Sequence, residues 1–282
     1  MSGPFFAQLR WELRKLWTRP RTYLGFAAMF AFELLMSLLW RLPAVREVML
    51  REFWKMHLEL AQAFSGLTSA VHLAGESMAM IGGLFLGFVA SDVVSKEIED
   101  GTLRTLLCRP VGRGAVFLQK LVVCLLYAIA LALFAGLSAL VLGLVFEGRG
   151  PLVIVAFSES ILASLDFRQG LVRYLFAISM LAGSMLTVAL MGFALSCCGL
   201  RPGGVIVVGG TMLMVDHLVR IQPGFAAISP YTLATRLMSW RQVFNKPIPW
   251  PRLERNYGQL LVLDLCLVAA AWWAFRRRDL TR

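Results

Sequence analysis

Six long apolar runs constrain this chain more than any other feature of its sequence. A helix needs roughly 20 consecutive apolar residues to cross about 30 Å of hydrocarbon. Runs of this kind lie at residues 22–40, 73–94, 114–146, 171–199, 203–220 and 259–275. The composition agrees, because 58% of the 282 residues are hydrophobic and only 16% are charged, against about 25% charged residues in soluble domains. We therefore expect an all-α polytopic membrane protein with six transmembrane helices.

The basic residues predict how these spans are oriented. The net charge of +11 is spread over helix ends and short loops, so we expect no nucleic-acid partner. An even number of spans places both termini on one side, and short segments rich in Lys and Arg stay in the cytoplasm. The N-terminal residues, the segment 95–113 and the final FRRRDLTR are all basic in this way. The prediction is a multi-pass protein of a bacterial inner membrane with both termini cytoplasmic.

Residues 1–21 predict an amphipathic helix ahead of the first span. Its apolar face consists of Phe6, Leu9, Leu13, Leu16 and Trp17. These residues recur at the three- and four-residue spacing of one helical face, and Pro20 ends the helix. Such a helix is suited to lie in the plane of the lipid headgroups. The alternative is that these residues are only a charged segment preceding span one. We expect residues 22–282 to form a single six-span domain.

The segments predicted on the outer side differ in character. Residues 41–72 carry mixed charge and would be helical just outside the membrane, and the partly polar residues 147–170 would dip into the interface. Residues 221–258 contain five prolines and two tryptophans. That composition is typical of short broken helices at the membrane surface.

The segment 95–113 is charged, although long apolar runs flank it on both sides. We expect the helix of span two to end near Gly101, since glycine adopts the left-handed cap most easily. Asp100 or Thr102 can then cap a second short helix, which Pro110 ends. Its apolar edge would be Leu103, Leu106 and Leu107, and its charged rim Glu97, Glu99, Arg104, Arg109 and Arg113. A cytoplasmic partner is the simplest candidate to cover the apolar edge.

In order and spacing, this segment resembles the cytoplasmic signature of type-2 ATP-binding-cassette (ABC) exporter permeases. The matching residues are Glu97, Glu99, Gly101, Thr102, Leu103, Leu106, Leu107, Pro110 and Arg113. ISPYTLATRLMSW, residues 228–240, is similar to the Ser-Pro-containing segment that precedes the last span in that family. The resemblance implies an elbow helix at the N-terminus and a coupling helix between spans two and three that docks on an ATPase.

The resemblance also implies a function. The chain would be the permease subunit of an ATP-driven exporter, and it would work as a homodimer or with a related half. Since the sequence contains no G-x-x-x-x-G-K-[ST] phosphate loop, two copies of a separate ATPase would hold ATP and Mg²⁺, and this chain would carry no cofactor. An accessory protein on the outer side would be a further partner.

Other functions stay open at this point. The chain could transmit ATP-driven motion to an outer partner without moving a solute, or serve metalloenzyme maturation by moving a sulfur or copper species. A membrane-embedded enzyme is less supported, because the sequence has no H-E-x-x-H motif and no Ser and His at a common depth. We therefore expect no enzymatic activity on this chain.

Three acidic residues fall within the predicted spans, where a charge is expensive and is by default a functional candidate. Asp216 lies one helical turn from Arg220, which favours a local ion pair, and Asp264 would reach the interface from an early turn of span six. Glu33 has no helical partner, so we expect it to face protein or a water-filled cavity. All three are candidates for a cavity or pathway.

Two further patterns concern packing and metal binding. Gly83 with Gly87, and Gly192 with Ser196, allow close helix contact, either within one chain or between two copies. The three histidines and the neighbouring methionines form no ligand motif, so we expect no metal site.

Overall fold

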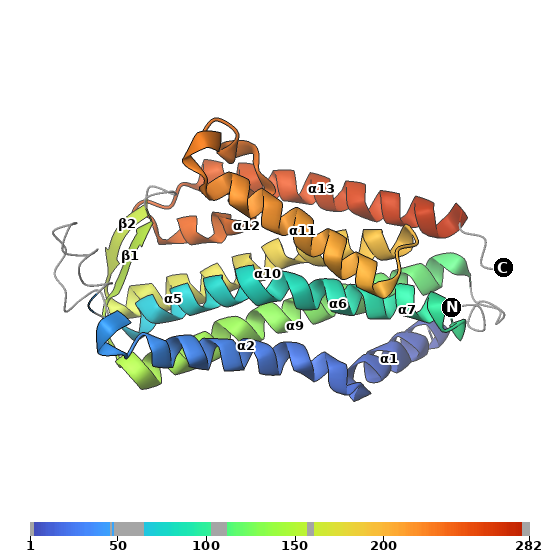
Figure 1. The fold of residues 1–282 in the computed structure, drawn as a ribbon, viewed down its shortest axis with the longest axis horizontal. Coiled ribbons are helices and arrows are strands. Elements are labelled where there is room, and N and C mark those ends of the chain that lie inside the picture. The colour runs from blue at the N-terminus through green and yellow to red at the C-terminus, as the bar shows by residue number, and fades with distance from the viewer. Residues whose placement is uncertain (1–2, 46, 48–64, 103–111, 157–160, 278–282) are drawn as a thin grey trace.

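A computed structural model gives the fold and describes residues 3–45, 47, 65–102, 112–156 and 161–277. Long helices run side by side, and one small hairpin lies at one end of the bundle (Figure 1). In chain order the elements are α1 (Gly3–Thr18), α2 (Pro20–Leu39), α5 (Gly66–Ser77), the π-helical turn η1 (Met78–Gly82), α6 (Gly83–Val93), α7 (Ser95–Glu99), α9 (Arg113–Glu147), β1 (Leu152–Ala156), β2 (Ile161–Leu165), α10 (Phe167–Cys197), α11 (Pro202–Ile221), η3 (Pro223–Phe225), η4 (Ser229–Tyr231), α12 (Leu233–Leu237), η5 (Met238–Phe244) and α13 (Trp250–Arg277).

Six helical stretches are long and apolar enough to cross a membrane, as the six runs predict. They are Pro20–Leu39, Gly66–Glu99, Arg113–Glu147, Phe167–Cys197, Pro202–Ile221 and Trp250–Arg277. The all-α polytopic class is therefore confirmed. Span two begins earlier than predicted, because Ser65 caps the helix by accepting a hydrogen bond from the Thr68 N–H at 3.2 Å. Residues 66–72 are helical, and their place outside the membrane stays a prediction.

The first and last helices meet at the same end of the bundle. α1, α7, the start of α9 and the end of α13 gather at what we call the charged end, and the β1–β2 hairpin lies at the opposite, or hairpin, end (Figure 1). This arrangement agrees with an even number of spans. The assignment of the charged end to the cytoplasm stays a prediction from the basic residues.

The core lies where α5, α9 and α10 pack together. Gly66 and Gly143 let α5 and α9 approach so closely that a Cβ atom on either residue would overlap the other backbone. Tyr174 of α10 donates a hydrogen bond to the carbonyl oxygen of Gly136 at 2.7 Å. Because small residues let helix backbones approach closely in a membrane, these contacts fix the three central helices.

The small residues of α6 and α10 meet within one chain. A Cβ atom on Gly192 would lie 3.3 Å from the Cα of Gly87 and 3.0 Å from the Cβ of Ala90. Ser196 donates a hydrogen bond to the carbonyl oxygen of Ala90 at 3.1 Å. The sequence left open whether these residues pack within one chain or between two copies. The structure shows the contact within one chain.

The hairpin end holds the elements that the sequence predicted least well. β1 and β2 pair antiparallel, where the sequence suggested a segment dipping into the interface. The N–H of Val153 donates to the Thr68 hydroxyl at 3.0 Å, which fastens the hairpin to α5. The short elements η3, η4, α12 and η5 follow α11, as the prolines and tryptophans of 221–258 predict.

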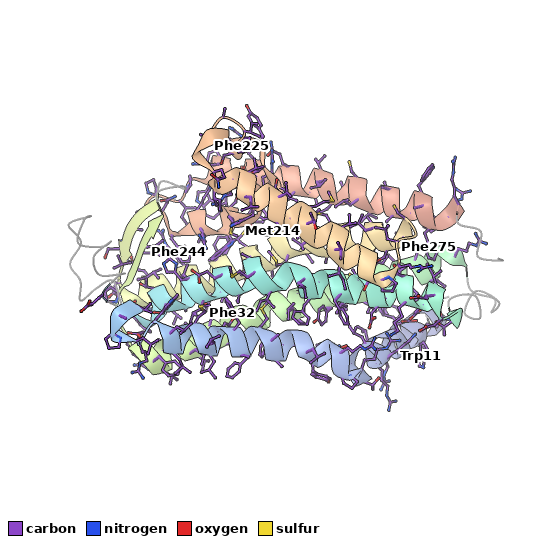
Figure 2. The ribbon with its side chains drawn as sticks, in the orientation of Figure 1. Trp11, Phe32, Met214, Phe225, Phe244 and Phe275 are labelled. Carbon is purple, nitrogen blue, oxygen red and sulfur yellow. The ribbon has the colours of Figure 1, made fainter. Side chains whose placement is uncertain are left out.

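α1 is the amphipathic helix that the sequence predicts, but only some of the residues predicted on its apolar face pack against the protein. Leu9, Leu13 and Leu16 pack against the core, whereas Phe6 and Trp17 are exposed together with Trp11. Figure 2 shows Trp11 on the outer side of α1. The aromatic side chains are therefore placed to contact lipid, and the leucines fasten α1 to the bundle.

Candidate functional site

The turn after span two has the conformation that its glycine predicts. α6 ends at Val93, α7 runs to Glu99, and Gly101 follows with a positive φ of 69°. Its N–H donates to the carbonyl oxygen of Ile98 at 3.1 Å. A side chain at Gly101 would strain this left-handed backbone, so the sequence determines where the helix of span two stops.

Glu97 lies inside the protein, although the sequence placed it on a charged rim. Only 3% of the residue is exposed. Its carboxylate oxygens accept hydrogen bonds from the ammonium groups of Lys15 and Lys120, each at 2.5 Å. The rim assignment of Glu97 is therefore wrong, because two lysines from other helices enclose the side chain. Glu99, two residues on, is exposed and fits a rim position.

Lys120 is the most deeply buried charge at this end. It is 1% exposed, and it also donates to the carbonyl oxygen of Val93 at 3.0 Å and lies 3.9 Å from the carboxylate of Glu12. α1 covers this turn of α9 and keeps Lys120 from water. We call Glu12, Lys15, Glu97 and Lys120 the Glu97 cluster, whose two positive and two negative charges balance.

The Glu97 cluster joins three parts of the chain that are distant in sequence. Glu12 and Lys15 belong to α1, Glu97 to α7 and Lys120 to α9. Nearby, Gln119 donates a side-chain hydrogen bond to Gln8 at 2.9 Å. A buried ion pair is favourable only when its geometry is good and further hydrogen bonds satisfy the remaining polar atoms of both side chains. The cluster is therefore a rigid connection between the first helix, the turn after span two and the start of span three.

Weaker polar contacts surround this connection. Asp92 lies 3.8 Å from Arg19 and 3.9 Å from Arg21, both partly exposed, so each pair contributes little. Arg113 is exposed and donates to the carbonyl oxygen of Arg276 at 3.3 Å. That bond ties the start of the third span to the end of the sixth.

The predicted coupling helix itself falls outside the described residues. Leu103, Arg104, Leu106, Leu107 and Pro110 belong to residues 103–111, so their roles stay predictions. The structure describes both ends of this segment. Thr102 donates its hydroxyl to the carbonyl oxygen of Glu97 at 3.2 Å, which connects the beginning of the segment directly to the Glu97 cluster.

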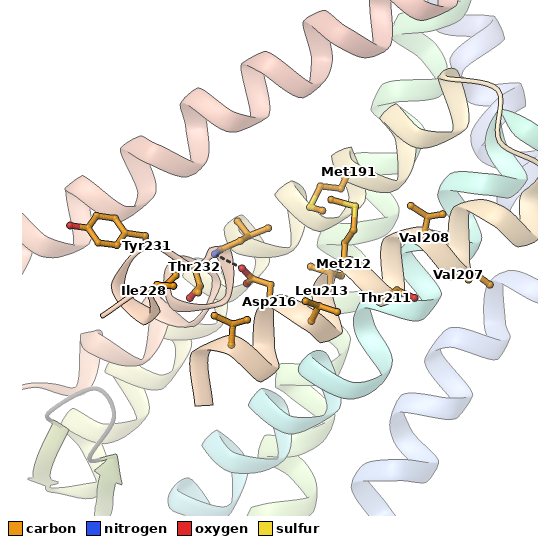
Figure 3. Close-up of a pocket in the computed structure, with 13 residues that line it drawn as sticks. Met191, Val207, Val208, Thr211, Met212, Leu213, Asp216, Ile228, Tyr231 and Thr232 are labelled. Carbon is orange, nitrogen blue, oxygen red and sulfur yellow. Dashed lines mark hydrogen bonds between the residues drawn. The ribbon is translucent and has the colours of Figure 1, made fainter. Parts of the chain in front are cut away.

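A groove of about 750 Å³ lies beside α11 towards the hairpin end (Figure 3). The residues that line it are Met191, Val207, Val208, Thr211, Met212, Leu213, Val215, Asp216, Val219, Ile228, Tyr231, Thr232 and Leu233. Most of these side chains are apolar. Among the described residues of α11 only Val205 is buried, so the groove is open on one side of the bundle.

Asp216 has a structural partner that the sequence did not predict. Its carboxylate accepts hydrogen bonds from the backbone N–H groups of Leu233, at 3.0 Å, and Ala234. These two N–H groups begin α12 and have no acceptor within that helix. Asp216 therefore fastens α12 to α11 and shapes the wall of the groove.

We expect Asp216→Ala to weaken this wall. Loss of a carboxylate that caps a helix costs about 0.5–2 kcal/mol of stability. Asp216→Asn keeps one acceptor oxygen and should lose less. Thermal unfolding in detergent, with Ile228→Ala as a control in the same groove, measures both variants. Equal unfolding temperatures for the Ala, Asn and unchanged proteins would contradict the capping role.

The other two intramembrane carboxylates face protein. Asp264 lies near the middle of α13, which begins at Trp250, and its reach to the interface stays a prediction. Its Oδ1 is buried beside the hydroxyl of Thr187 on α10. Glu33 is fully buried between α2, α5 and α9, one of the two environments expected for it.

Comparison with known proteins adds independent information. Residues 8–199 match the family described as ABC-2 family transporter protein. The uncharacterized membrane protein YdbK of Bacillus subtilis (strain 168) is 26% identical over 202 residues, which cover 68% of this chain and 74% of YdbK. The uncharacterized protein YhcI of the same organism is 34% identical over 68 residues, covering 24% of this chain and 22% of YhcI. No solved structure gives a significant match.

Proposed function

Because the chain belongs to the ABC-2 family of transporter proteins, we propose that it is the permease subunit of an ATP-driven exporter. A separate ATPase chain hydrolyses ATP, and this chain converts the resulting motion into export of a substrate. The Glu97 cluster is the observation that carries the proposal. It fixes the segment between spans two and three to α1 and α9 at the charged end.

The mechanism follows from that rigid connection. ATP-driven closure of the ATPase pushes on residues 103–111. The preceding residue, Thr102, is bonded to Glu97, and the Glu97 cluster joins this point to α1, span two and span three. Packed interfaces switch between discrete arrangements and do not deform continuously. A packed element therefore moves as a rigid body. The motion therefore reaches the groove beside α11 through α6, which packs against both α10 and α11.

The proposal includes the partners of the complex. Two ATPase copies hold ATP and Mg²⁺ at the cytoplasmic side, and a second permease copy completes the assembly. α11 and α13 supply the contact between copies, since few of their residues are buried within one chain. The groove beside α11 then faces the substrate pathway, with Asp216 and Thr211 as polar groups in its wall.

Purification from native membranes tests this function. A tagged chain extracted in mild detergent should bring down an ATPase subunit that contains a phosphate-binding loop, and the eluate should hydrolyse ATP. Reconstituted into vesicles, the complex should move a solute in an ATP-dependent manner. ATP hydrolysis that moves no solute but shifts an outer partner would favour transmission of motion instead. An eluate without any ATPase subunit would contradict both functions.

The predicted orientation can be tested separately. We expect an impermeant thiol reagent to label a single cysteine at Asn245 in intact cells but not one at Arg113, in a background without the native cysteines. Arg113 lies at the charged end, where it donates to the carbonyl oxygen of Arg276. Asn245 follows η5 at the hairpin end, where the next residue, Lys246, donates to the Ser164 carbonyl of β2. Permeabilised cells provide the control, because both positions should then react. Labelling at Arg113 alone in intact cells would reverse the topology.

A further inference from the structure

Glu33 occupies a polar site inside the bundle that the proposed function does not use. The residue is 0% exposed. Ser77 of α5 donates its hydroxyl to Glu33 Oε1 at 3.0 Å, and the Ser138 hydroxyl of α9 lies 2.5 Å from Oε2. One carboxyl group therefore contacts hydroxyls from two other spans, and it joins spans one, two and three.

The structure gives this carboxyl group no cation. Among the described residues, no ion pair includes Glu33. Tyr174 of α10 lies within electrostatic reach of Glu33 and donates its hydroxyl to the Gly136 carbonyl. His72 and Glu76 of α5 lie within reach of Arg241 instead. An ionised Glu33 would thus be a buried charge without compensation, which costs several kcal/mol.

The hydrogen bonds of Ser138 are compatible with a proton on Glu33. The Ser138 hydroxyl lies 2.8 Å from the carbonyl oxygen of Phe134 as well as 2.5 Å from Glu33. A hydroxyl has one hydrogen to donate. If Ser138 donates it to Phe134, the short contact with Glu33 requires a hydrogen on the carboxyl group. With a protonated Glu33, Ser138 can bond both Phe134 and Glu33, whereas with an ionised one it donates its single hydrogen to one of them.

A metal ion does not fit between these oxygen atoms. Ca²⁺ and Mg²⁺ lie about 2.0–2.6 Å from each of six or more oxygen ligands, which must therefore stand apart from one another. Here Ser138 and Glu33 are in direct hydrogen-bond contact at 2.5 Å. A single hydrogen is the ligand that this spacing accommodates.

We infer that Glu33 is a proton-binding site in the membrane. Its carboxyl group carries a proton at neutral pH and donates it to Ser138, and this proton completes the junction of spans one, two and three. The inference does not depend on transport. The junction lies directly before the π-helical turn η1, which begins at Met78, and such turns are frequent at functional sites. Removal of the proton would loosen span one beside this turn of span two.

Infrared spectroscopy of the purified protein tests the inference. The carbonyl-stretch band of a protonated carboxylic acid should be present at neutral pH and should lose intensity in Glu33→Gln. Asp264→Asn is the matched control, since it removes another carboxyl group within a span, on α13 and apart from the Glu33 junction, and should leave the Glu33 band in place. Identical spectra of the unchanged protein and Glu33→Gln in this region would show an ionised carboxylate and overturn the inference.

Two further variants keep the test decisive if Glu33→Gln does not fold. Ser138→Ala removes the acceptor of the proton and should shift the Glu33 band, because a carbonyl-stretch frequency depends on hydrogen bonding. Ser179→Ala removes an exposed hydroxyl that contacts only its own helix and should leave the band unchanged. A band that does not move in Ser138→Ala would also overturn the inference.

Discussion

Lys120→Met is expected to destabilise the protein by about 3–5 kcal/mol, which is the usual effect of removing one partner from a buried ion pair. Lys120 is 1% exposed and donates to both Glu97 and the Val93 carbonyl. Without it, Glu97 keeps only Lys15. Unfolding by a denaturing detergent in mixed micelles measures the change in the free energy of unfolding.

Two comparisons separate the buried pair from general charge effects. Lys15→Met should cost less, because the Lys15 side chain is 24% exposed and water already screens its charge. Arg21→Ala, at a side chain that is 52% exposed and 3.9 Å from Asp92, should change stability by less than about 1 kcal/mol. Equal losses for Lys120→Met and Arg21→Ala would contradict the central place of Lys120 in the Glu97 cluster.

Two aspartate substitutions in the predicted coupling helix, Leu103→Asp and Leu106→Asp, are expected to abolish binding of the ATPase. Leu103 and Leu106 would fill a groove on that partner, and burial of one leucine contributes roughly 1.5–3 kcal/mol. Leu103→Asp combined with Leu106→Asp replaces this gain with two carboxylates in an apolar groove. The permease should still fold and insert, because these side chains lie outside the predicted hydrocarbon spans. Recovery of the ATPase with the tagged chain is the measurement.

The control for that experiment is Ile228→Asp, which places the same charge on an exposed side chain at the other side of the bundle. It should leave recovery of the ATPase unchanged. If the double aspartate variant also retains the ATPase at the normal level, the coupling role of residues 95–113 is wrong, whereas the stability of the Glu97 cluster remains a separate question.

The sequence determined the class of fold because hydrocarbon thickness fixes the length of an apolar helix. The six runs predicted six spans, and the structure has them. Gly101 predicted the end of the helix in span two for an equally local reason, since its left-handed backbone favours glycine. The five prolines of 221–258 predicted broken short elements, because proline cannot continue a helix interior.

The sequence could not decide the surroundings of the charged residues. Glu97 and Glu99 stand two residues apart in one charged stretch, yet only Glu97 meets Lys15 and Lys120. Asp216 reaches backbone N–H groups of α12, a contact that local spacing in α11 does not contain. Asp264 lies near the middle of α13 because that helix begins before the apolar run does.

These differences have one physical reason. Span length and helix termination depend on the residue types within a short stretch, so the sequence alone determines them. The burial of a charge depends on which distant helices pack beside it. Only the packing of α1 over α9 places Lys15 next to Glu97 and Lys120, and only the meeting of α2 with α5 and α9 closes the site of Glu33.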